Sequence, residues 1–465
     1  MDDGAATRPS GDPLGLPEAE MRRLGYWVVD QVVDHFQSGH ERPAVQTATP
    51  VELRAALGGE IPAQPGDPLA AMQQLVDVAL ANMQHGDHPR YFSRVPGPAS
   101  FAGVLGEWLG TGFNAIAASW KGGSGPATVE LVVLDWLRSL LGLPEGSEGV
   151  LASGGSLANA TAMAAARRAE GDGVAYLSDQ THSSIARGLA AMGFAPEMVR
   201  VIGTGDDLRL TADLVAAQLA GDRAAGRRPG FVVATAGTTN TGAVDDLVGL
   251  SDLCTAEGMW FHVDGAYGAP AALCDRGRRV LTGIDRADSL VLDPHKWLFQ
   301  PYDVGCLLVR RPGALDATFH MTPEYLLDVH GETAEVDFRN RSLELSRRSR
   351  ALKIWLTFHT YGLERIAAAI EHGILLAEAA ERMLAADARF ELVTPAQLGI
   401  VTFALRGASH DQQTARAEAL GRSGYAAVTT TRLHRRSVLR LCTINPRTGE
   451  EDVAATLDRL AAQTG

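Results

Sequence analysis

Cysteine is scarce in this sequence, and the few cysteines present form no recognisable pattern. They stand singly along 465 residues with no CxxC spacing, at Cys254, Cys274, Cys306 and Cys442. Structural zinc sites and disulfide frameworks both need cysteines at characteristic spacings. The sequence therefore indicates neither, which is typical of a protein from a reducing compartment.

Positive charge and long apolar runs are also in short supply. There are 42 lysines and arginines against 55 aspartates and glutamates, so the formal net charge is -13. Binders of nucleic acid or of anionic membranes need clustered positive charge, and a membrane-spanning helix needs about 20 consecutive apolar residues. The first ten residues are acidic and polar, unlike a secretory signal. We therefore expect a cytoplasmic protein with no nucleic-acid or membrane partner.

The N-terminal part of the chain has helical periodicity but little material for a core of its own. From residue 17 mostly apolar side chains recur at about 3.6-residue spacing, at Met21, Leu24, Trp27, Val28, Gln31, Val32 and Phe36. Proline-containing stretches at 42–50 and 61–68 then interrupt a series of short helices. We expect residues 1–98 to form a helical segment that packs on something else, such as a second subunit.

A different pattern begins near residue 149, where short apolar runs alternate with longer amphipathic stretches. The runs are almost wholly aliphatic, as expected for strands covered on both faces, and span residues 149–152, 174–177, 231–236, 260–263, 289–292 and 304–309. Helical stretches such as 156–169 and 247–256 lie between most of them. This alternation predicts an α/β domain with a largely parallel sheet, over residues 99–366.

The last hundred residues predict a smaller domain. A helical stretch at 363–385 precedes strand-like runs at 399–405 and 437–442. This order is typical of an α+β unit. We therefore expect a small C-terminal α+β domain over residues 367–465.

The first polar motif is a glycine-rich turn between a predicted strand and a predicted helix. It reads Ser153-Gly154-Gly155-Ser156, and glycines there let backbone N–H groups face a ligand while the helix N-terminus favours an anion such as phosphate. A plain turn has the same composition, so the motif alone does not decide between the two. It matches neither the GxGxxG fingerprint nor a Walker loop, which disfavours a nicotinamide dehydrogenase.

Two charged residues follow neighbouring buried strands. Asp264 comes directly after residues 260–263, where a carboxylate either caps the next turn or needs a cationic partner such as a protonated pyridine nitrogen. Lys296 has apolar flanks, a setting typical of lysines that form Schiff bases, although an ion pair with a nearby acid also explains it. One strand–helix–strand unit separates the two, so we expect both side chains in one crevice at the carboxyl ends of the strands.

Three further polar residues lie at predicted strand ends. His182 offers an imidazole that can lie against a cofactor ring and transfer protons, although a single histidine often has only a structural role. Thr238 and Thr239 follow another strand and either bind a ligand or cap a turn. Each of these residues alone is a weak signal.

Metal and serine-hydrolase chemistry have little support. No GxSxG elbow is present, and the cysteines lie in no recognisable nucleophile setting. Close pairs of metal-binding side chains occur without a third ligand at regular spacing, at His85 with His88 and at His262 with Asp264. We therefore expect no metal.

In order along the chain, these motifs form a specific combination. His182, GTTNTG at 237–242, HVDGAY at 262–267 and DPHKWL at 293–298 resemble the fold-type-I pyridoxal-phosphate enzymes. Among these the chain is similar to the group II amino-acid decarboxylases of the aromatic-L-amino-acid decarboxylase type, with further matches at 88–92, 126–130, 136–137 and 350–355. The resemblance covers nearly the whole chain after residue 20. It implies a transferase-like large domain with a mostly parallel, seven-stranded sheet.

The resemblance also implies roles for the motif residues. Lys296 would bind pyridoxal 5′-phosphate covalently, and Asp264 would pair with the pyridine nitrogen of that cofactor. His182 and Ala266 would lie on opposite faces of the ring, with Thr239 near the ring and the substrate carboxylate. The phosphate would be held by Gly154, Gly155, Ser156 and His295. The family forms homodimers with a shared active site, and its N-terminal segment wraps over the partner.

Two departures from the family pattern affect the expected reaction. Family decarboxylases usually carry, on a mobile loop, a tyrosine that reprotonates Cα; we place this loop at 324–347 and its tyrosine position at Phe338. In plant relatives a phenylalanine there accompanies aldehyde synthesis, so the product is either an aldehyde or, if a donor such as His182 acts instead, the amine. Asp293 replaces the amide often found before Pro-His-Lys, which leaves its role open.

The predicted substrate pocket departs from the family as well. Where aromatic decarboxylases have rings, this chain has Arg94 and Val95, and it has Ala118 shortly before Trp120. Small and charged residues in place of rings predict a bulkier or more polar substrate. A β-eliminating lyase on the same scaffold stays as the alternative reaction, and a non-catalytic role is disfavoured because Lys296 is present.

Overall fold

A seven-stranded sheet forms the centre of the large domain. The computed structural model describes residues 12–321 and 335–462. In this sheet the strand order is β1-β7-β6-β5-β4-β2-β3. The strands are β1 (Glu148–Ala152), β2 (Val174–Ser178), β3 (Val199–Ile202), β4 (Pro229–Thr235), β5 (Trp260–Asp264), β6 (Ser289–Leu292) and β7 (Gly305–Val309).

The direction of the strands confirms the predicted mostly parallel sheet. The pairs β2–β3, β2–β4, β4–β5 and β5–β6 are parallel, whereas β7 runs antiparallel to both β1 and β6. The six predicted strands are all present. The seventh, β3, lies at the edge of the sheet, and its half-exposed Val-Arg-Val-Ile sequence lacks the continuous apolar run of its neighbours.

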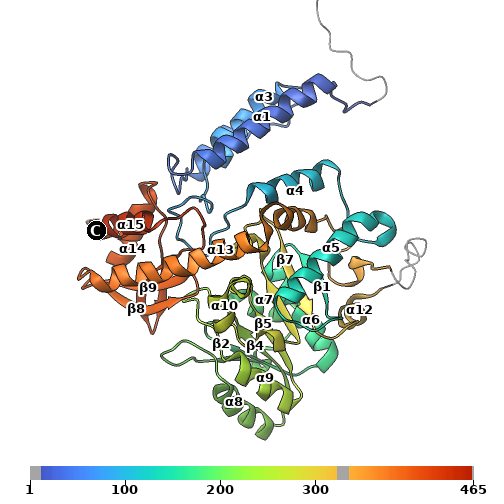
Figure 1. Cartoon of the computed structure of the whole chain (residues 1–465), viewed down its shortest axis with the longest axis vertical. Helices are drawn as coiled ribbons and strands as arrows, with labels where there is room; N and C mark the ends of the chain where they lie inside the picture. The colour runs from blue at the N-terminus through green and yellow to red at the C-terminus, as the bar shows by residue number, and fades with distance from the viewer. Residues whose placement is uncertain (1–11, 322–334, 463–465) are drawn as a thin grey trace, which may run out of the picture.

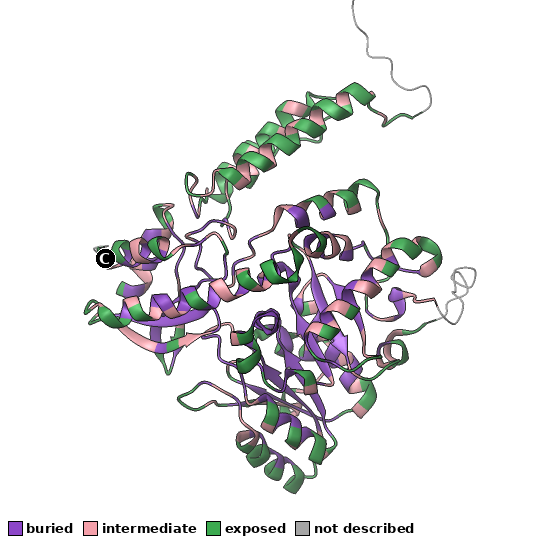
Figure 2. Ribbon diagram, in the orientation of Figure 1, coloured by how far each residue is buried: buried purple, intermediate pink, exposed green. Residues whose placement is uncertain are grey.

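Helices cover both faces of this sheet, and the buried residues concentrate between the two layers (Figures 1 and 2). Helix α6 packs along β4–β7, and α9 packs on β4 and β5. The helices of this domain are α4 (Phe101–Gly112), α5 (Trp120–Leu140), α6 (Gly155–Glu170), α7 (Ser183–Ala191), α8 (Ala212–Ala224), α9 (Leu247–Glu257), α10 (Asp275–Val280), α11 (Pro294–Trp297) and α12 (Ala314–Phe319). Short 3-10 turns include η2 (Pro196–Met198), η3 (Ala269–Leu273), η4 (Ile284–Arg286) and η6 (Phe338–Asn340).

The C-terminal part forms a second layer with its own core, as predicted. An antiparallel sheet in the order β10-β11-β9-β8 packs against helices around Phe390, Phe403 and Leu439. Its elements are β8 (Phe390–Gln397), β9 (Ile400–Leu405), α14 (His410–Arg422), β10 (Thr429–Leu433), β11 (Arg436–Cys442) and α15 (Glu450–Ala462). The long helix α13 (Ala351–Ala386), kinked at Gly362, joins the two parts. The predicted boundary after residue 366 falls within this helix and stays a prediction.

The N-terminal helices form an arm beside the main body (Figure 1). The arm comprises α1 (Glu18–Gln37), α2 (Pro50–Leu57), α3 (Pro68–Gln74) and the π-helical η1 (Leu75–Leu80). The helix predicted from residue 17 is confirmed. These four elements contain no buried residue, and large side chains such as Met21, Tyr26 and Val51 are exposed. Among residues 12–321 and 335–462, the arm therefore has an apolar surface that is left exposed.

The cysteines and the apolar runs, which the composition brought up, can be followed in the residues that the structure describes. The four cysteines are buried and unpaired. Within residues 12–321 and 335–462, every helix is too short or too polar to cross a membrane.

Candidate active site

A cavity of about 370 Å³ opens at the carboxyl ends of the central strands. The parallel strands and the turns after them bring residues from distant parts of the chain to this edge of the sheet. Nine residues predicted from the sequence line the cavity together: Gly154, Gly155, Ser156, His182, Thr239, Asp264, Ala266, His295 and Lys296.

Lys296 lies at the first turn after β6 and forms an ion pair inside this cavity. Its Nζ is 2.8 Å from Oδ2 of Asp293, whose side chain is only 3% exposed. Burial disfavours the ammonium form, but the carboxylates of Asp293 and Asp264 outweigh that effect and raise the pKa of Lys296. The acidic partner that the sequence left open is therefore present, and the half-buried amine lies in a ligand-sized cavity; its Schiff-base role stays a prediction.

Asp264 ends β5 and is 4% exposed. Burial raises the pKa of this carboxyl group, and the facing ammonium of Lys296 opposes that rise. Two groups donate hydrogen bonds to it: the Ala266 N–H to Oδ1 at 3.1 Å and the Asn159 amide to Oδ2 at 3.0 Å. The carboxylate is therefore held in one orientation at the wall of the cavity.

The glycine turn leaves space for an anion at the start of α6. The helix begins after Gly154 without a side-chain cap, and its first residues line the cavity. A Cβ on Gly155 would lie 2.8 Å from Oδ2 of Asp293 and 3.2 Å from Cβ of Ala266, so only glycine leaves this space open. Within the described residues, Asp293 Oδ1 and Thr235 Oγ1 are buried without a hydrogen-bond partner. The uncapped start of α6 fits an anionic group of a ligand, and the unpartnered Asp293 oxygen and Thr235 hydroxyl fit other polar groups of it.

Two histidines border the same cavity in defined hydrogen-bonding states. The Nδ1 atom of His295 accepts the Val304 N–H at 3.2 Å, and burial lowers the pKa of this imidazole, although the charge of Asp293 opposes that shift. The neutral ring then carries its proton on Nε2, which lies 3.6 Å from Asp293 Oδ2 and can donate to an anion in the cavity. His182 caps α7, where its Nδ1 accepts the Ser184 N–H at 3.3 Å.

Comparison with known proteins identifies this arrangement. The model of the pyridoxal-dependent decarboxylase conserved domain matches residues 50–406. The chain belongs to the pyridoxal-dependent decarboxylase family. It is 42% identical to the aromatic-L-amino-acid decarboxylase of Bacillus atrophaeus over 462 residues, covering 97% of this chain and 96% of that protein. The predicted membership of the group II decarboxylases is confirmed.

Plant decarboxylases are similar in sequence and in structure. Tryptophan decarboxylase TDC2 of Camptotheca acuminata is 33% identical over 423 residues, covering 87% of this chain and 85% of that protein. A crystal structure of Oryza sativa TDC with PLP and tryptamine superposes with a TM-score of 0.91 at 28% identity, covering 97% of this chain and 98% of that one. A structure of 4-hydroxyphenylacetaldehyde synthase from Rhodiola rosea gives 0.88 at 28% identity, covering 96% and 98%. This protein is thus a pyridoxal 5′-phosphate-dependent carboxy-lyase.

The structure places Phe338 outside the Lys296 cavity of its own chain, and its predicted place on the catalytic loop of the decarboxylase stays a prediction. Its side chain is fully buried in η6 and does not line the cavity around Lys296. The guanidinium of Arg347 lies 4.9 Å from the centre of its ring, and Arg347 in turn forms a fully buried ion pair with Glu130 at 2.6 Å. The Phe338 ring is therefore packed in the core of its own chain. Of the predicted loop, residues 324–334 lie outside the described part of the chain.

The four predicted substrate-pocket residues lie away from the Lys296 cavity of their own chain. Arg94 is exposed, Val95 is half-buried, and Ala118 is 7% exposed. The Trp120 N–H donates to Asp337 at the start of α5. None of the four lines the cavity. Their role in substrate binding stays a prediction.

Sequence analysis missed several residues that build the site. Asn159 and Ser184 line the cavity, and the Tyr267 ring stacks on Trp297 with centroids 5.2 Å apart. Arg440 on β11 is 3% exposed and donates to the carbonyls of Arg94 and Asn240, joining the N-terminal segment to the threonine turn. A lone arginine within the apolar run Val-Leu-Arg-Leu-Cys was the one signal of this in the sequence.

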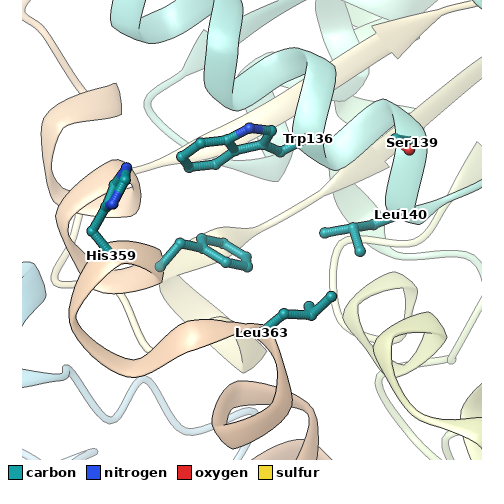
Figure 3. Close-up of a pocket in the computed structure, with 6 residues that line it drawn as sticks. Trp136, Ser139, Leu140, His359 and Leu363 are labelled. Atoms are coloured by element: carbon teal, nitrogen blue, oxygen red, sulfur yellow. The ribbon is translucent and has the colours of Figure 1, made fainter.

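A second hollow lies on the outside of the large domain, between α5 and α13. It measures about 350 Å³, and the side chains of Trp136, Leu140, His359 and Leu363 point toward one another there (Figure 3). Trp136 and His359 have ring centroids 5.8 Å apart. With His359 as its one titratable lining residue, this hollow lacks the paired acid and base that line the Lys296 cavity.

Proposed function

We propose that this decarboxylase removes the α-carboxyl group of an aromatic L-amino acid and releases the amine. The observation that carries the proposal is the half-buried lysine, Lys296, which faces two carboxylates in a ligand-sized cavity. Support for an aromatic substrate comes from relatives at 42% and 33% identity, which are named for aromatic, tryptophan and tyrosine substrates. We favour decarboxylation over β-elimination because the chain belongs to the decarboxylase family.

We assign the cofactor contacts to the residues that line the cavity. When bound, pyridoxal 5′-phosphate supplies an electron sink for the electron pair left at Cα when carbon dioxide departs. The N-terminus of α6, with Gly154, Gly155, Ser156 and His295, would hold its phosphate. Asp264 would keep a proton on the pyridine nitrogen, and His182 and Ala266 would enclose the ring.

Lys296 would provide the amine that binds the cofactor covalently. An ammonium cannot form that bond, so its proton must first leave. Asp293 Oδ2 lies 2.8 Å from Nζ and is the nearest acceptor we can assign. We therefore give Asp293 the role of holding the lysine proton, which answers the question that its sequence position left open.

For the substrate we propose an aromatic amino acid with a polar ring substituent, such as a hydroxyl group. The support is the charged and small side chains of Arg94 and Ala118 at positions where relatives have rings. A kcat/KM panel of phenylalanine, tyrosine, 3,4-dihydroxyphenylalanine, tryptophan and 5-hydroxytryptophan tests this choice. We expect the hydroxylated members to lead; a clear preference for phenylalanine or tryptophan would contradict it.

We favour the amine as product because the argument for an aldehyde rested on Phe338, which is a core residue. The one tyrosine between residues 303 and 360 is Tyr325. We assign to it the loop-tyrosine role that the family resemblance implies. The similarity to an aldehyde synthase concerns the fold and is shared with the tryptophan decarboxylases.

We also propose that the enzyme is a homodimer whose arm covers a second copy. The support is the apolar arm surface, which has no buried residue in this chain. Exposed side chains such as Met21, Tyr26 and Val51 would be buried against the partner. Light scattering on the purified protein tests this: the expected mass is twice the 49.3 kDa of one chain.

The decisive experiment follows product and gas on one purified holoenzyme. We expect carbon dioxide and amine in equal amounts from an aromatic amino acid, with no oxygen consumed. Lys296→Ala should lack both the turnover and the borohydride-reducible visible band of the bound cofactor. A wild-type enzyme that has this band but releases pyruvate or ammonia in place of carbon dioxide would overturn the proposal.

A further inference from the structure

A chain of buried side chains runs behind Asp264, away from the cavity. Asn159, which is 1% exposed, lies one turn into α6, and its Nδ2 donates to Asp264 Oδ2 at 3.0 Å. Its Oδ1 lies 3.0 Å from Nε2 of His262, which is fully buried on β5. On the neighbouring strand β6, Ser289 Oγ lies 2.7 Å from Nδ1 of His262 and accepts the Trp260 indole N–H at 2.8 Å.

Elementary donor and acceptor rules fix the direction of every bond in this chain. An indole N–H only donates, so the Ser289 oxygen accepts from Trp260. An ionised carboxylate only accepts, so the Asn159 NH2 group donates to Asp264 and the amide oxygen faces His262 Nε2, which leaves Nδ1 to accept the Ser289 hydroxyl. Burial lowers the pKa of His262 to about 3, so the ring is neutral and its single proton lies on Nε2. Nε2–H therefore donates to an oxygen. The Asn159 amide must present its oxygen to His262 and its NH2 group to Asp264.

The same amide also reaches the second histidine of the site. Its Nδ2 lies 3.4 Å from Ser184 Oγ, which is 2.9 Å from Nδ1 of His182. His182 Nδ1 already accepts the backbone N–H of Ser184, so it carries no proton and the hydroxyl donates to it as well. The two hydrogens of the Asn159 amide therefore bond to Asp264, which we assign to the ring nitrogen, and to Ser184. Ser184 in turn bonds His182, which we assign to one face of the ring.

We infer that Asn159 is a positioning residue for Asp264, with its amide oxygen bound by His262, which Ser289 and Trp260 hold in turn. Its N–H and the Ala266 N–H donate to opposite oxygens of the carboxylate, which favours the ionised form in a site where burial disfavours it. An amide in the reverse orientation would place oxygen against oxygen. The inference rests on the pyridoxal-phosphate chemistry of the family, in which Asp264 holds the proton of the ring nitrogen.

Other charged groups face the same carboxylate and define what the experiment must separate. The charges of Lys296 and His182 lower the pKa of Asp264, and the charge of Asp293 raises it. A substitution at Asn159 leaves the Lys296 and Asp293 side chains in place and removes, with the amide, the 3.4 Å contact to Ser184 that links it to His182. A change in the titration of the site after such a substitution therefore reports on the amide.

The first test reads the proton position in His262 directly and needs no cofactor. Nitrogen NMR of 15N-histidine-labelled full-length apoprotein, with His262→Gln to assign the signal, distinguishes the two neutral tautomers. We expect the Nε2–H form with no titration between pH 5 and 9. In Ser289→Ala the ring should keep the Nε2–H form, because the Asn159 oxygen still faces Nε2, and the Nδ1 signal should move, because Nδ1 loses its hydrogen-bond donor. A wild-type ring that titrates in this range, or carries its proton on Nδ1, would overturn the inference.

The second test measures the holoenzyme. Asn159→Leu keeps the approximate volume and removes the donor, and Thr161→Val is the matched control, because it removes another buried polar group from α6 whose bond stays within that helix. We expect Asn159→Leu to lower kcat about tenfold to a hundredfold, the range for loss of a hydrogen bond to a charged group. KM should change less than about twofold, and the pH titration of the cofactor absorbance should shift. Thr161→Val should match wild type in all three.

The outcomes separate this inference from the proposed substrate. An unchanged absorbance titration in Asn159→Leu, with kcat within about twofold of Thr161→Val, would refute a positioning role. If Asn159→Leu fails to fold, the tautomer measurement on wild type and on Ser289→Ala decides. An enzyme that decarboxylates none of the aromatic amino acids would refute the proposed substrate, while the tautomer and absorbance results would still test the role of Asn159.

Discussion

Asp293 differs from the amide that relatives often carry before Pro-His-Lys, and its geometry gives that difference a chemical consequence. Its carboxylate is paired with the Lys296 ammonium at 2.8 Å and is almost wholly buried. A charge in this position stabilises the protonated lysine, whereas a neutral amide would not. The identity of one residue therefore sets the pH at which the amine becomes available to the cofactor.

We expect Asp293→Asn to lower the pKa of Lys296, since the carboxylate raises it. The apoprotein should then take up pyridoxal 5′-phosphate covalently at a lower pH, with the midpoint shifted down by roughly one to three units. The measurement is the rate of growth of the visible band against pH. Asp135→Asn, at a side chain that is 72% exposed, is the control and should leave the midpoint in place. An upward shift in Asp293→Asn would contradict the assignment.

A pair of substitutions tests the loop tyrosine at residue scale. If Tyr325 reprotonates Cα, Tyr325→Phe should divert the product from amine toward aldehyde, with oxygen uptake and peroxide formation. Phe338→Tyr should leave the product as amine but lower stability by about 1–3 kcal/mol, because a hydroxyl group must enter a fully packed position beside Arg347. Product analysis and urea unfolding check the two halves. Aldehyde from the wild-type enzyme would reverse our interpretation of both residues.

At the scale of elements, the turn from β1 into α6 is the most constrained part of the site. Gly155→Ala should weaken cofactor binding about tenfold to a hundredfold, since a Cβ would stand 2.8 Å from Asp293 Oδ2 and overpacking costs roughly 1–3 kcal/mol. Equilibrium titration of the apoprotein measures the effect. Gly221→Ala on α8, where a Cβ meets nothing within 4 Å, should bind the cofactor as wild type does. Equal affinities for the two variants would show that the turn does not hold the phosphate.

Burial determines which of the strands could be predicted from the sequence. Strands β4–β7 are buried along nearly their whole length, so a continuous apolar run marks each one. By contrast β3 and β10 are half-exposed edge strands, and their mixed sequences carry no such run. The sequence predicts the long helix only from residue 363, whereas α13 begins at Ala351. The reason is Gly362, which interrupts the helical pattern where the helix is kinked.

The site was predictable to the extent that its residues end strands. Asp264 and Lys296 follow buried strands, and both line the predicted crevice. Asn159 lies inside a helix, where an asparagine has no sequence signal for function, and only the packing of α6 on the sheet brings it to Asp264. The packing of the Phe338 ring against Arg347 likewise has no signal in the sequence.

At the scale of the whole molecule, Asp87 joins the arm to the C-terminal part. His35 of α1 lies 2.6 Å from its carboxylate, and the Arg447 guanidinium lies 3.7 Å from it. Burial opposes ionisation, but the hydrogen bond and charge of His35, with the charge of Arg447, lower the pKa of Asp87 to about 2. A depressed carboxyl pKa stabilises the fold at pH values above about 4, and that contribution is lost as the pH falls toward 2.

We therefore expect Asp87→Asn to lower the free energy of unfolding by roughly 2–3 kcal/mol at pH 7. The difference from wild type should stay constant down to about pH 4 and then shrink. Urea unfolding over this pH range measures it. Asp77→Asn, an exposed acid on η1, should show no such difference. A gap between wild type and Asp87→Asn that widens on acidification would contradict the sign of this contribution.

The predicted substrate residues and the Lys296 cavity belong to different parts of one chain, and a shared active site would reconcile them. If Arg94 of one copy serves the cavity of its partner, then Lys296→Ala and Arg94→Glu are defects in opposite subunits. Arg94 is exposed, so its replacement should leave the fold intact. Each variant alone should be impaired, Lys296→Ala completely. In a refolded equal mixture, half the dimers are mixed and each holds one intact site, so about one quarter of wild-type activity should return. Restoration would establish that the arm side of one copy completes the site of the other, whereas activity no higher than the average of the two parent variants would place both residues in the same subunit's site.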